Sequence, residues 1–353
     1  LSEEKIAQYL EEIKAQREKD LPAHPVPLDF FEEEPLIWGR AWGAQSEVGK
    51  LKVVLINSPG LEFDHEDILS HQNWYDIHVK TDREKALEQI ELLAKTLKEA
   101  GVEVHYLKRP EIIHGPYSPA NPRVWATRDP GIVVKGGAIV GRMSLPWRKK
   151  DEYYWTKTIV ELGIPILFTV NGKGTFEGGN VVWLDPEHVA IGLSIRTNEE
   201  GIKQVSYILQ EHCGVKEIKV VALPGYLYNL QWPAGGVAHL DVVFGMANIN
   251  VAVIYPPLVP YDFIEYLKKK KIKLIEVPPE DFRKMACNIV ALEPSKVIMN
   301  SGCNYTRKAL ENEGVDVIEL ELSEFVKSGG AAHCATAPLV REPGPCLLYT
   351  SDA

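Results

Sequence analysis

The chain has 353 residues, of which 45% are hydrophobic and 25% charged, a balance typical of a globular protein with a sizeable core. Acidic residues outnumber basic residues by 49 to 39, and no lysine and arginine block is interleaved with aromatic residues, so we expect no nucleic-acid partner. No apolar run approaches the ~20 residues that cross a bilayer, and residues 1–20 form a charged helical pattern rather than a signal peptide. We therefore expect no membrane partner and a cytoplasmic location.

Short runs rich in β-branched residues alternate along the chain with amphipathic helical stretches, which predicts an α/β fold. Helices are predicted at residues 3–17, 83–100, 151–162, 198–212, 261–270 and 305–312. Strands are predicted at residues 51–56, 102–107, 131–134, 138–140, 166–170, 181–184, 189–193, 218–223, 242–246, 251–255, 272–277, 296–299 and 315–320. One or two strands, a helix and a further strand form a unit that recurs about five times.

The predicted helix at residues 83–100 illustrates how the elements are identified. Its apolar residues recur at helical spacing on one face, Asp82 is a suitable N-cap, and Gly101 ends the pattern. The residues expected on the buried face are Ala86, Ile90, Leu93, Ala94 and Leu97.

No composition break or flexible linker divides residues 46–343, which predicts a single catalytic domain over that range. Residues 1–45 are predicted to form a helix and an extended arm that pack on this domain. Residues 344–353 end in CLLYTSDA, which looks like the translation of a sequencing adapter, so we expect a disordered, non-native tail there.

The five cysteines stand at positions 213, 287, 303, 334 and 346. They form no CxxC pair and no Cys/His cluster with zinc-ligand spacing, so neither a metal site nor a disulfide framework is predicted. Each cysteine is therefore either an apolar residue of the core or a lone thiol with a chemical role.

Four polar clusters lie where a predicted strand meets a loop, the place where a rigid scaffold presents functional side chains. They are TRDP at 127–130, FEGGN at 176–180, HLD at 239–241, and two glycines at 329–330 followed by HC at 333–334. Taken singly, each has an ordinary interpretation as a turn, a surface pair or a buried cysteine in a glycine-rich loop. The interpretation as one site rests on all four clusters in order.

A site for a guanidinium ion needs carboxylates that accept paired hydrogen bonds, and Asp129, Glu177 and Asp241 are the available set. The central carbon is a poor electrophile, and a thiolate splits its reaction into two easier steps, with Cys334 as the candidate sulfur. His239 is the candidate proton carrier, because a histidine can both give and take a proton near neutral pH. His239 and Asp241 are two residues apart, so in a strand both would point to the same face. Paired glycines after Glu177 and before Cys334 allow close approach of the backbone.

In this order the motifs resemble those of the guanidine-modifying superfamily, which includes arginine deiminase, dimethylarginine dimethylaminohydrolase, agmatine deiminase and glycine amidinotransferase. The resemblance runs from about residue 46 to residue 342, and it extends to SEVGKLKVVL from residue 46, MSLPWRKKDEY from residue 143 and IGLSIRT from residue 191. It implies a five-bladed α/β propeller, a pentein, with the active site in a central channel, and it implies no cofactor and no metal.

The resemblance also implies roles for particular residues. The catalytic set is the nucleophile, the general acid and base, and the acid that orients the histidine or binds guanidinium, namely Cys334, His239 and Glu177. In the substrate-binding set two aspartates accept the guanidinium and two arginines grip a substrate carboxylate. The substrate-binding residues are Asp129, Asp241, Arg196, Arg148 and Asn180.

Three departures argue against a plain arginine deiminase. Asn57 and the glycines at 329–330 stand where deiminases commonly carry arginine, and Asn180 stands where they carry aspartate.

The favoured activity is a hydrolase that cleaves a C–N bond of arginine or a substituted arginine. The alternative is an amidinotransferase that passes the amidino group to an amine such as glycine. A binding module without activity and a papain-like protease are the less favoured alternatives. The expected partner is a small guanidino substrate, with a homodimer as a further possibility.

Overall fold

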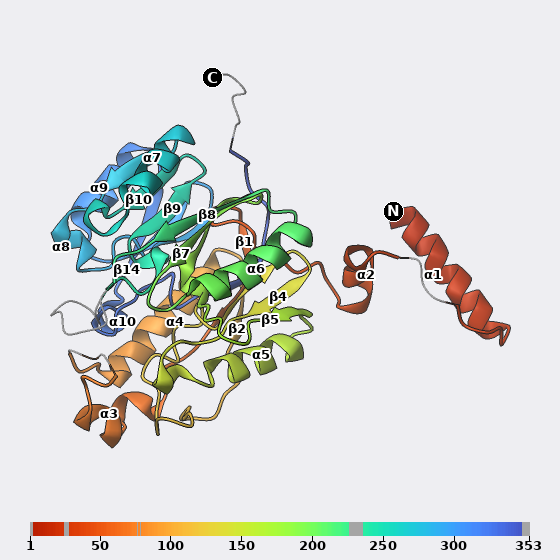
Figure 1. Cartoon of the computed structure of the whole chain (residues 1–353), viewed down its shortest axis with the longest axis horizontal. Coiled ribbons are helices and arrows are strands. Elements are labelled where there is room, and N and C mark those ends of the chain that lie inside the picture. Colours follow the sequence, from red (N-terminus) through yellow and green to blue (C-terminus); the bar gives the residue numbers. More distant parts are fainter. Residues whose placement is uncertain (1–2, 25–27, 76, 78, 226–235, 348–353) are drawn as a thin grey trace.

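The computed structural model describes residues 3–24, 28–75, 77, 79–225 and 236–347 (Figure 1). Its strands are β1 Leu51–Ile56, β2 Glu103–Tyr106, β3 Gly131–Val134, β4 Gly137–Val140, β5 Ile166–Thr169, β6 Val181–Asp185, β7 His188–Leu193, β8 Glu217–Ala222, β9 Phe244–Asn248, β10 Val251–Ile254, β11 Lys273–Glu276, β12 Val290–Glu293, β13 Lys296–Asn300, β14 Asp316–Leu320 and β15 Ala337–Arg341. Its helices are α1 Glu3–Glu18, α2 Phe30–Ile37, α3 Glu66–Ser70, α4 Arg83–Glu99, α5 Asp151–Glu161, α6 Glu199–Glu211, α7 Tyr261–Lys269, α8 Pro279–Phe282, α9 Asn304–Asn312 and α10 Ser323–Lys327.

The strands form five small sheets of three strands that share one design. In the sheet β3-β4-β5, β3 is antiparallel to β4, and β5 lies parallel to β4 after the crossover helix α5. The same order recurs with α6, α7 and α9 in the sheets β6-β7-β8, β9-β10-β11 and β12-β13-β14. In the remaining sheet, β15 from the end of the chain pairs antiparallel with β1, which is parallel to β2. The repeated unit predicted from the sequence is confirmed.

Neighbouring sheets contact one another mainly through the strand that begins each unit. β15 packs on β3, β6 on β9, β9 on β12, and β12 on β1. A shared apolar cluster joins Ile132 and Val134 of β3 to Val181 and Trp183 of β6. These first strands are almost wholly buried, so the loops that lead into them come from five sheets and meet inside the molecule.

The helix α4 forms as predicted. Asp82 Oδ1 accepts the backbone N–H of Lys85 at 3.2 Å, and Gly101 adopts a positive φ of 80° just beyond the helix. All of its expected core residues are buried, namely Ala86, Ile90, Leu93, Ala94 and Leu97.

The prediction missed several short elements, and it misplaced one strand start. The helices α3, α8 and α10 have four or five residues, too few to show a helical period, and α2 contains Pro35. β15 contains Pro338, which argues against a strand, and β12 has only three apolar residues followed by Glu293, a run too short to distinguish a strand from a helix. The strand expected at 242–246 starts at Phe244, because residues 240–242 form a 3-10 turn. His239 and Asp241 are therefore not side by side on a strand, and that prediction was wrong.

The two ends of the chain differ in how they meet the sheets. Figure 1 shows α1 apart from the body, whereas in α2 the Phe31 ring lies 4.5 Å from Lys135 Nζ and Glu34 accepts the backbone N–H of Trp42 at 2.8 Å. At the other end Leu347 is buried in a core cluster, and residues 348–353 lie outside the description. The division at residues 45 and 343 and the non-native tail stay predictions. No helix of the described ranges has the length and apolar character that a membrane span requires.

Candidate active site

The predicted catalytic residues come from loops that enter four different sheets. Asp129 precedes β3, Glu177 precedes β6, His239 and Asp241 precede β9, and Cys334 precedes β15. Each is at most 6% exposed. The fold thus brings together in a buried cluster the residues that the sequence spreads over more than 200 positions.

The imidazole of His239 lies between two carboxylates. Its Nε2 is 2.8 Å from Glu177 Oε2, and its Nδ1 is 3.5 Å from Asp129 Oδ1. Burial alone would lower the pKa of His239, but the charges of Asp129, Glu177 and Asp241 outweigh it and raise the pKa above the ordinary value. Ionised carboxylates only accept hydrogen bonds, so this geometry favours a doubly protonated imidazolium that can act as a general acid.

Glu177 is held on both of its oxygens. Oε1 accepts the backbone N–H and the hydroxyl of Ser144, both at 2.9 Å, and Oε2 faces His239. Burial acts to raise its pKa, but the bond to His239 and the charges of Arg196, His239 and Arg148 bring the pKa well below the ordinary value. Glu177 is therefore an ionised, fixed partner that orients the imidazole.

The Cys334 thiol is buried in negative surroundings. Burial, followed by the charges of Asp241 and Asp129, raises its pKa well above the ordinary value, and Sγ lies 3.6 Å from Asp241 Oδ2. The resting thiol is protonated at neutral pH. A cation placed beside Asp129 and Asp241 offsets these charges and favours the thiolate.

His333, next to the nucleophile, is not a solvated loop residue. Its Nδ1 is 2.8 Å from Asp241 Oδ2 and its Nε2 is 3.1 Å from Glu47 Oε2, and all three residues are buried. Burial and the charge of Arg128 act to lower the pKa of His333, but Glu47 and Asp241 raise it overall. The pKa of Glu47 is lowered to about 2, because His333 and Arg128 outweigh its burial. This carboxylate, imidazolium and carboxylate bridge fixes Asp241 beside Sγ.

The predicted substrate arginines are both 2% exposed. Arg148 donates from Nη1 to Asp129 Oδ2 at 2.5 Å and from Nε to Asp151 Oδ2 at 2.9 Å, and its Nη2 has no hydrogen-bond partner among the described residues. Burial acts to lower the pKa of Arg148, but the charges of Asp129 and Asp151 raise it overall. Arg196 lies near enough to Glu177 for its charge to lower the pKa of that acid. Their contacts with a substrate carboxylate stay predictions.

Asn180 has contacts within the chain. Its Nδ2 is 2.9 Å from Thr197 Oγ1, 3.1 Å from Ser194 Oγ and 3.3 Å from the Ala238 carbonyl, and its Oδ1 accepts the Leu240 N–H at 3.1 Å. These bonds hold the backbone on both sides of His239. The predicted substrate contact of Asn180 is untested.

Close packing around the imidazole requires a glycine in the EGGN motif. A Cβ on Gly179 would lie 2.8 Å from both Asp129 Oδ1 and His239 Nδ1. Likewise, a Cβ on Gly330 would lie 3.0 Å from Cys334 Sγ. Both motif glycines therefore allow the close approach that the sequence predicted.

The sequence prediction missed Asn288, which lies directly against the nucleophile. Its Oδ1 accepts the backbone N–H groups of Ala331 at 3.0 Å and Cys334 at 3.1 Å. Its Nδ2 donates to Cys334 Sγ at 3.1 Å and to the Asp241 carbonyl at 3.2 Å. Asn288 stands two residues before β12, the strand that was also missed, so the repeat itself was the signal that could have found it.

A metal ion would find three donors in this cluster. The ligand atoms of Asp129, Glu177 and His239 lie within 4.8 Å of one another. Arg148 already places a positive charge 2.5 Å from Asp129 Oδ2, and the raised pKa of His239 favours a protonated ring, which has no free lone pair for a metal. The donor set is therefore poorly suited to a cation, and a metal-free site stays our prediction.

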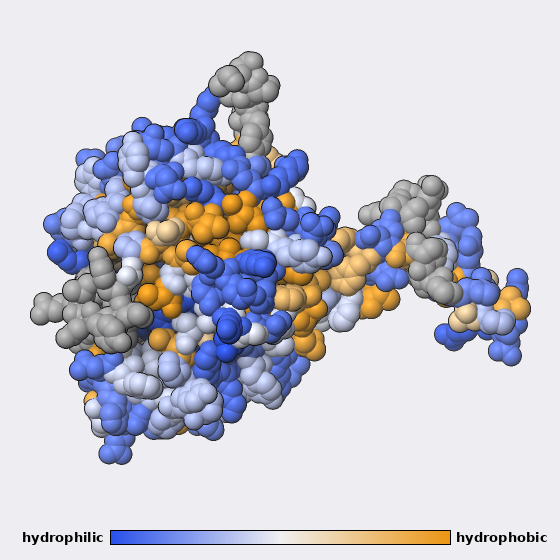
Figure 2. Space-filling view, in the orientation of Figure 1, coloured by the Kyte–Doolittle hydropathy of each residue, from blue (hydrophilic) through white to orange (hydrophobic). Residues whose placement is uncertain are grey.

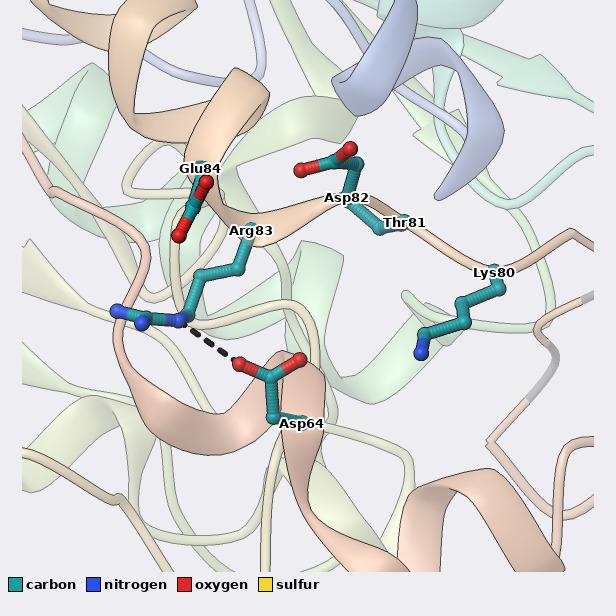
Figure 3. Close-up of a pocket in the computed structure, with 6 residues that line it drawn as sticks. All are labelled: Asp64, Lys80, Thr81, Asp82, Arg83 and Glu84. Carbon is teal, nitrogen blue, oxygen red and sulfur yellow. Dashed lines mark hydrogen bonds and ion pairs between the residues drawn. The ribbon is translucent and has the colours of Figure 1, made fainter.

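A cavity of about 400 Å³ opens elsewhere, at the start of α4 (Figure 3). Figure 3 shows Arg83 reaching Asp64, with a distance of 2.8 Å from Nε to Oδ2. Acidic and basic side chains are mixed around this cavity, and none of the predicted catalytic residues lines it. It is not the candidate active site.

Comparison with known proteins agrees with the geometry. A family model described as N,N dimethylarginine dimethylhydrolase, eukaryotic, matches residues 62–341. The chain belongs to this family. It is thus a member of the guanidine-modifying superfamily that the motifs predicted.

Relatives of this dimethylarginine hydrolase family member have several activities. The chain is 28% identical over 264 residues to 2-nitroimidazole nitrohydrolase of Mycobacterium sp. (strain JS330), covering 73% of this chain and 69% of that one. A DDAH mutant from Pseudomonas aeruginosa in complex with citrulline has a TM-score of 0.64 at 23% identity, over 82% of this chain and 99% of that one. The amidinotransferase SxtG from Microseira wollei has a TM-score of 0.68 at 16% identity, over 87% and 99%. The two structural matches show a common fold.

Proposed function

We propose that the chain is a hydrolase that cleaves a guanidinium C–N bond of arginine or of a substituted, for example methylated, arginine. The observation that carries the proposal is a pair of buried carboxylate oxygens, Oδ1 of Asp129 and Oδ1 of Asp241, which accept no hydrogen bond from the described residues, Asp129 Oδ1 having only the longer ion contact of 3.5 Å with His239 Nδ1. Such an acceptor is costly to leave unpaired, and a planar cation with several N–H donors satisfies two of them at once. Membership in the family supports the same substrate class.

The first half of the proposed reaction forms an adduct on Cys334. The substrate guanidinium binds beside Asp129 and Asp241 and offsets the negative charge that keeps the thiol protonated, so the thiol releases its proton to solvent. The thiolate attacks the guanidino carbon and forms the C–S bond. His239 gives its proton to the departing nitrogen, the C–N bond breaks, and ammonia or an amine leaves a thiouronium-type group on the sulfur.

The second half returns the enzyme to its starting state. His239, now neutral and still oriented by Glu177, takes a proton from water, and the hydroxide attacks the carbon of the adduct. The C–S bond breaks and the departing sulfur takes the proton of the added hydroxyl group, which restores the thiol and releases a ureido product such as citrulline. The net reaction adds one water molecule, and His239 is reprotonated without any cofactor.

An amidinotransferase shares the first half and replaces water by an amine. We propose water as the acceptor because the family is one of hydrolases, whereas the likeness to SxtG is one of fold. The relative that acts on 2-nitroimidazole fits the same chemistry. The ring carbon that bears the nitro group is bonded to three nitrogens, like a guanidino carbon.

We also propose that the five sheets are the blades of a propeller with the site in its central channel. The support is that neighbouring sheets contact one another and that the site residues stand before the first strands of their sheets.

We propose a homodimer as the assembled form. On and just after α2, the exposed apolar side chains of Leu36, Ile37 and Trp38 support this, since Ile37 is 69% exposed. Figure 2 shows apolar residues on this side of the molecule, where the arm meets the body. Ile37→Asp is expected to convert the dimer to a monomer in light scattering, and a wild-type monomer contradicts the proposal.

A substrate panel tests the activity. Arginine, mono- and dimethylarginine, agmatine, guanidinoacetate and 2-nitroimidazole are each incubated with and without glycine, and the products are identified by mass spectrometry. Citrulline formed from arginine regardless of glycine supports the hydrolase. Ornithine formed only with glycine supports a transferase instead, and failure to consume any guanidino compound contradicts the substrate class. A chelator is expected to leave the rate unchanged.

A further inference from the structure

We infer that Asn288 is a positioning residue that orients the Cys334 thiol and stabilises its thiolate by donating an amide N–H to Sγ. The inference rests on the proposed function, because it concerns the nucleophile of that reaction. Neither the sequence motifs nor the family resemblance had pointed to Asn288.

The orientation of the Asn288 amide is determined by its neighbours. Two backbone N–H groups, from Ala331 and Cys334, point at one end of the amide, and that end must therefore be the oxygen, which accepts both. The NH₂ end then necessarily faces Sγ, at 3.1 Å, and the Asp241 carbonyl, at 3.2 Å. Reversing the amide would place donors against donors. A single side chain thus fixes both ends of the turn that carries the thiol and aims a donor at its sulfur.

The charges around Cys334 explain why a hydrogen-bond donor from Asn288 would matter. Burial and the charges of Asp241 and Asp129 all oppose ionisation of Cys334, while the Asn288 amide and the Ala331 backbone favour the ionised form. Asp241 and Asp129 are needed for a cationic substrate, so the repulsion that they exert on the thiolate is built into the site. A neutral donor offsets it without competing for the guanidinium, as a lysine or arginine at position 288 would.

The position of Asn288 in the repeat supports the same role. Asn288 stands two residues before β12, as Asp129 stands two residues before β3. With Asn288 included, the loops before the first strands of all five sheets supply a polar side chain to the cluster. The alternative is that Asn288 only clamps a loop, as Asn300 does with the Lys284 carbonyl and the Leu322 N–H, both at 3.0 Å.

Asn288→Asp keeps the acceptor for Ala331 and Cys334 and replaces the donor to Sγ by a carboxylate oxygen, whereas Asn288→Ala removes the donor without adding a charge, so an upward shift in both variants assigns the effect to the donor. The matched control is Asn300→Asp, at an equally buried amide that does not touch the thiol. The rate of Cys334 alkylation by iodoacetamide is measured against pH, with the modified peptide quantified by mass spectrometry. We expect Asn288→Asp to move the rise in reactivity to higher pH and Asn300→Asp to leave it in place.

The shift of the alkylation profile along the pH axis is a better readout than the alkylation rate at one pH, because two opposing effects act on that rate. Each unit of upward shift lowers the thiolate fraction about tenfold at a fixed pH, while the more basic thiolate is about threefold more nucleophilic. The net loss of rate is about threefold per unit. For catalysis we expect kcat to fall at least tenfold in Asn288→Asp, with a smaller change in KM.

Three results overturn the inference. They are an unchanged alkylation profile in Asn288→Asp, an equal shift in Asn300→Asp, and no alkylation of wild-type Cys334 up to pH 9.5. Asn288→Ala, which buries no new charge, decides by the same readout if the aspartate variant does not fold. Alkylation needs no substrate, so an enzyme that consumes no guanidino compound refutes the proposed function while the alkylation profiles still decide the role of Asn288.

Discussion

Replacing His333 by glutamine is expected to destabilise the fold by about 3–5 kcal/mol, the usual cost of removing one partner of a buried ion pair. The imidazole of His333 lies 2.8 Å from Asp241 and 3.1 Å from Glu47, and glutamine removes the positive charge nearest to both carboxylates. Both carboxylates keep the more distant charge of Arg128, and Asp241 also keeps that of His239. Each attraction alone is worth about 4 kcal/mol at 4 Å in an effective dielectric of about 20, and desolvation offsets part of it. Unfolding entropy of about 2.1 cal/mol/K per residue over 353 residues converts the loss to a Tm lower by about 4–7 °C.

Calorimetry of His333→Gln, Glu47→Gln and the double variant tests this reasoning. The double variant should be more stable than the sum of the single losses predicts, because Glu47→Gln removes one of the two carboxylates that lose the imidazolium. His71→Gln is the control, since His71 and Asp67 form an exposed pair worth about 0–1 kcal/mol. A Tm of His333→Gln within 1 °C of wild type, or strictly additive losses, refutes the account of the bridge.

The bridge also predicts how the difference depends on pH. The pKa of His333 is raised in the fold, so its contribution is fully present below the unfolded value of about 6.5 and is lost as pH rises through the folded value. The pKa of Glu47 is lowered, so its contribution is present above about 4.5 and is lost as pH falls towards about 2. The Tm difference between wild type and His333→Gln should therefore be largest between about pH 4.5 and 6.5.

Three further substitutions test the site. Glu177→Gln removes a charge that raises the pKa of His239, so the alkaline limb of kcat/KM should move to lower pH; an unmoved limb contradicts His239 as the acid. Gly179→Ala places a Cβ 2.8 Å from Asp129 Oδ1 and His239 Nδ1 and should cut kcat/KM at least tenfold, whereas Gly214→Ala, at a φ of +76° with nothing within 4 Å, should lower stability but leave kcat/KM unchanged. Arg148→Lys tests the predicted grip on the substrate carboxylate: we expect a larger loss of kcat/KM for arginine than for agmatine, whereas equal losses would show that Arg148 serves only to hold Asp129.

Much of the fold could be predicted because its elements carry local signals. The helix α4 has a cap, a buried stripe and a terminal glycine, and each of these appears in the structure. The pairing of β1 with β15 could not be predicted in this way. Pro338 makes β15 look unlike a strand, and its partner strand β1 lies almost 300 residues earlier in the chain. Pairing at such a distance leaves no local pattern in the sequence.

In the candidate site, too, some features could be predicted from local sequence patterns and others could not. Asp129, Glu177, His239, Asp241 and Cys334 were predicted because their polar clusters lie where predicted strands meet loops and follow one another in the order of the family motifs, and the structure brings them together. The family resemblance implied the contact between Glu177 and His239, but the position of His239 before a 3-10 turn rather than in a strand was not predicted.

The contacts of two neighbours of the nucleophile were not predicted, for different reasons. Asn288 is a neutral amide before an overlooked strand, and its contact with Sγ exists only in the folded chain. The ion contact of His333 has no signal in the sequence, because its partner Glu47 lies 286 positions away in the chain.

The central claim is that Cys334 forms a covalent bond to the guanidino carbon. It is tested most directly by acid-quenching the enzyme during turnover of arginine or methylarginine and mapping the mass of the Cys334 peptide, beside Cys334→Ala and the buried-cysteine control Cys303→Ala. We predict a thiouronium-type adduct on Cys334, no turnover in Cys334→Ala and near-normal turnover in Cys303→Ala. Substrate consumption by Cys334→Ala at a rate comparable to wild type would contradict the claim.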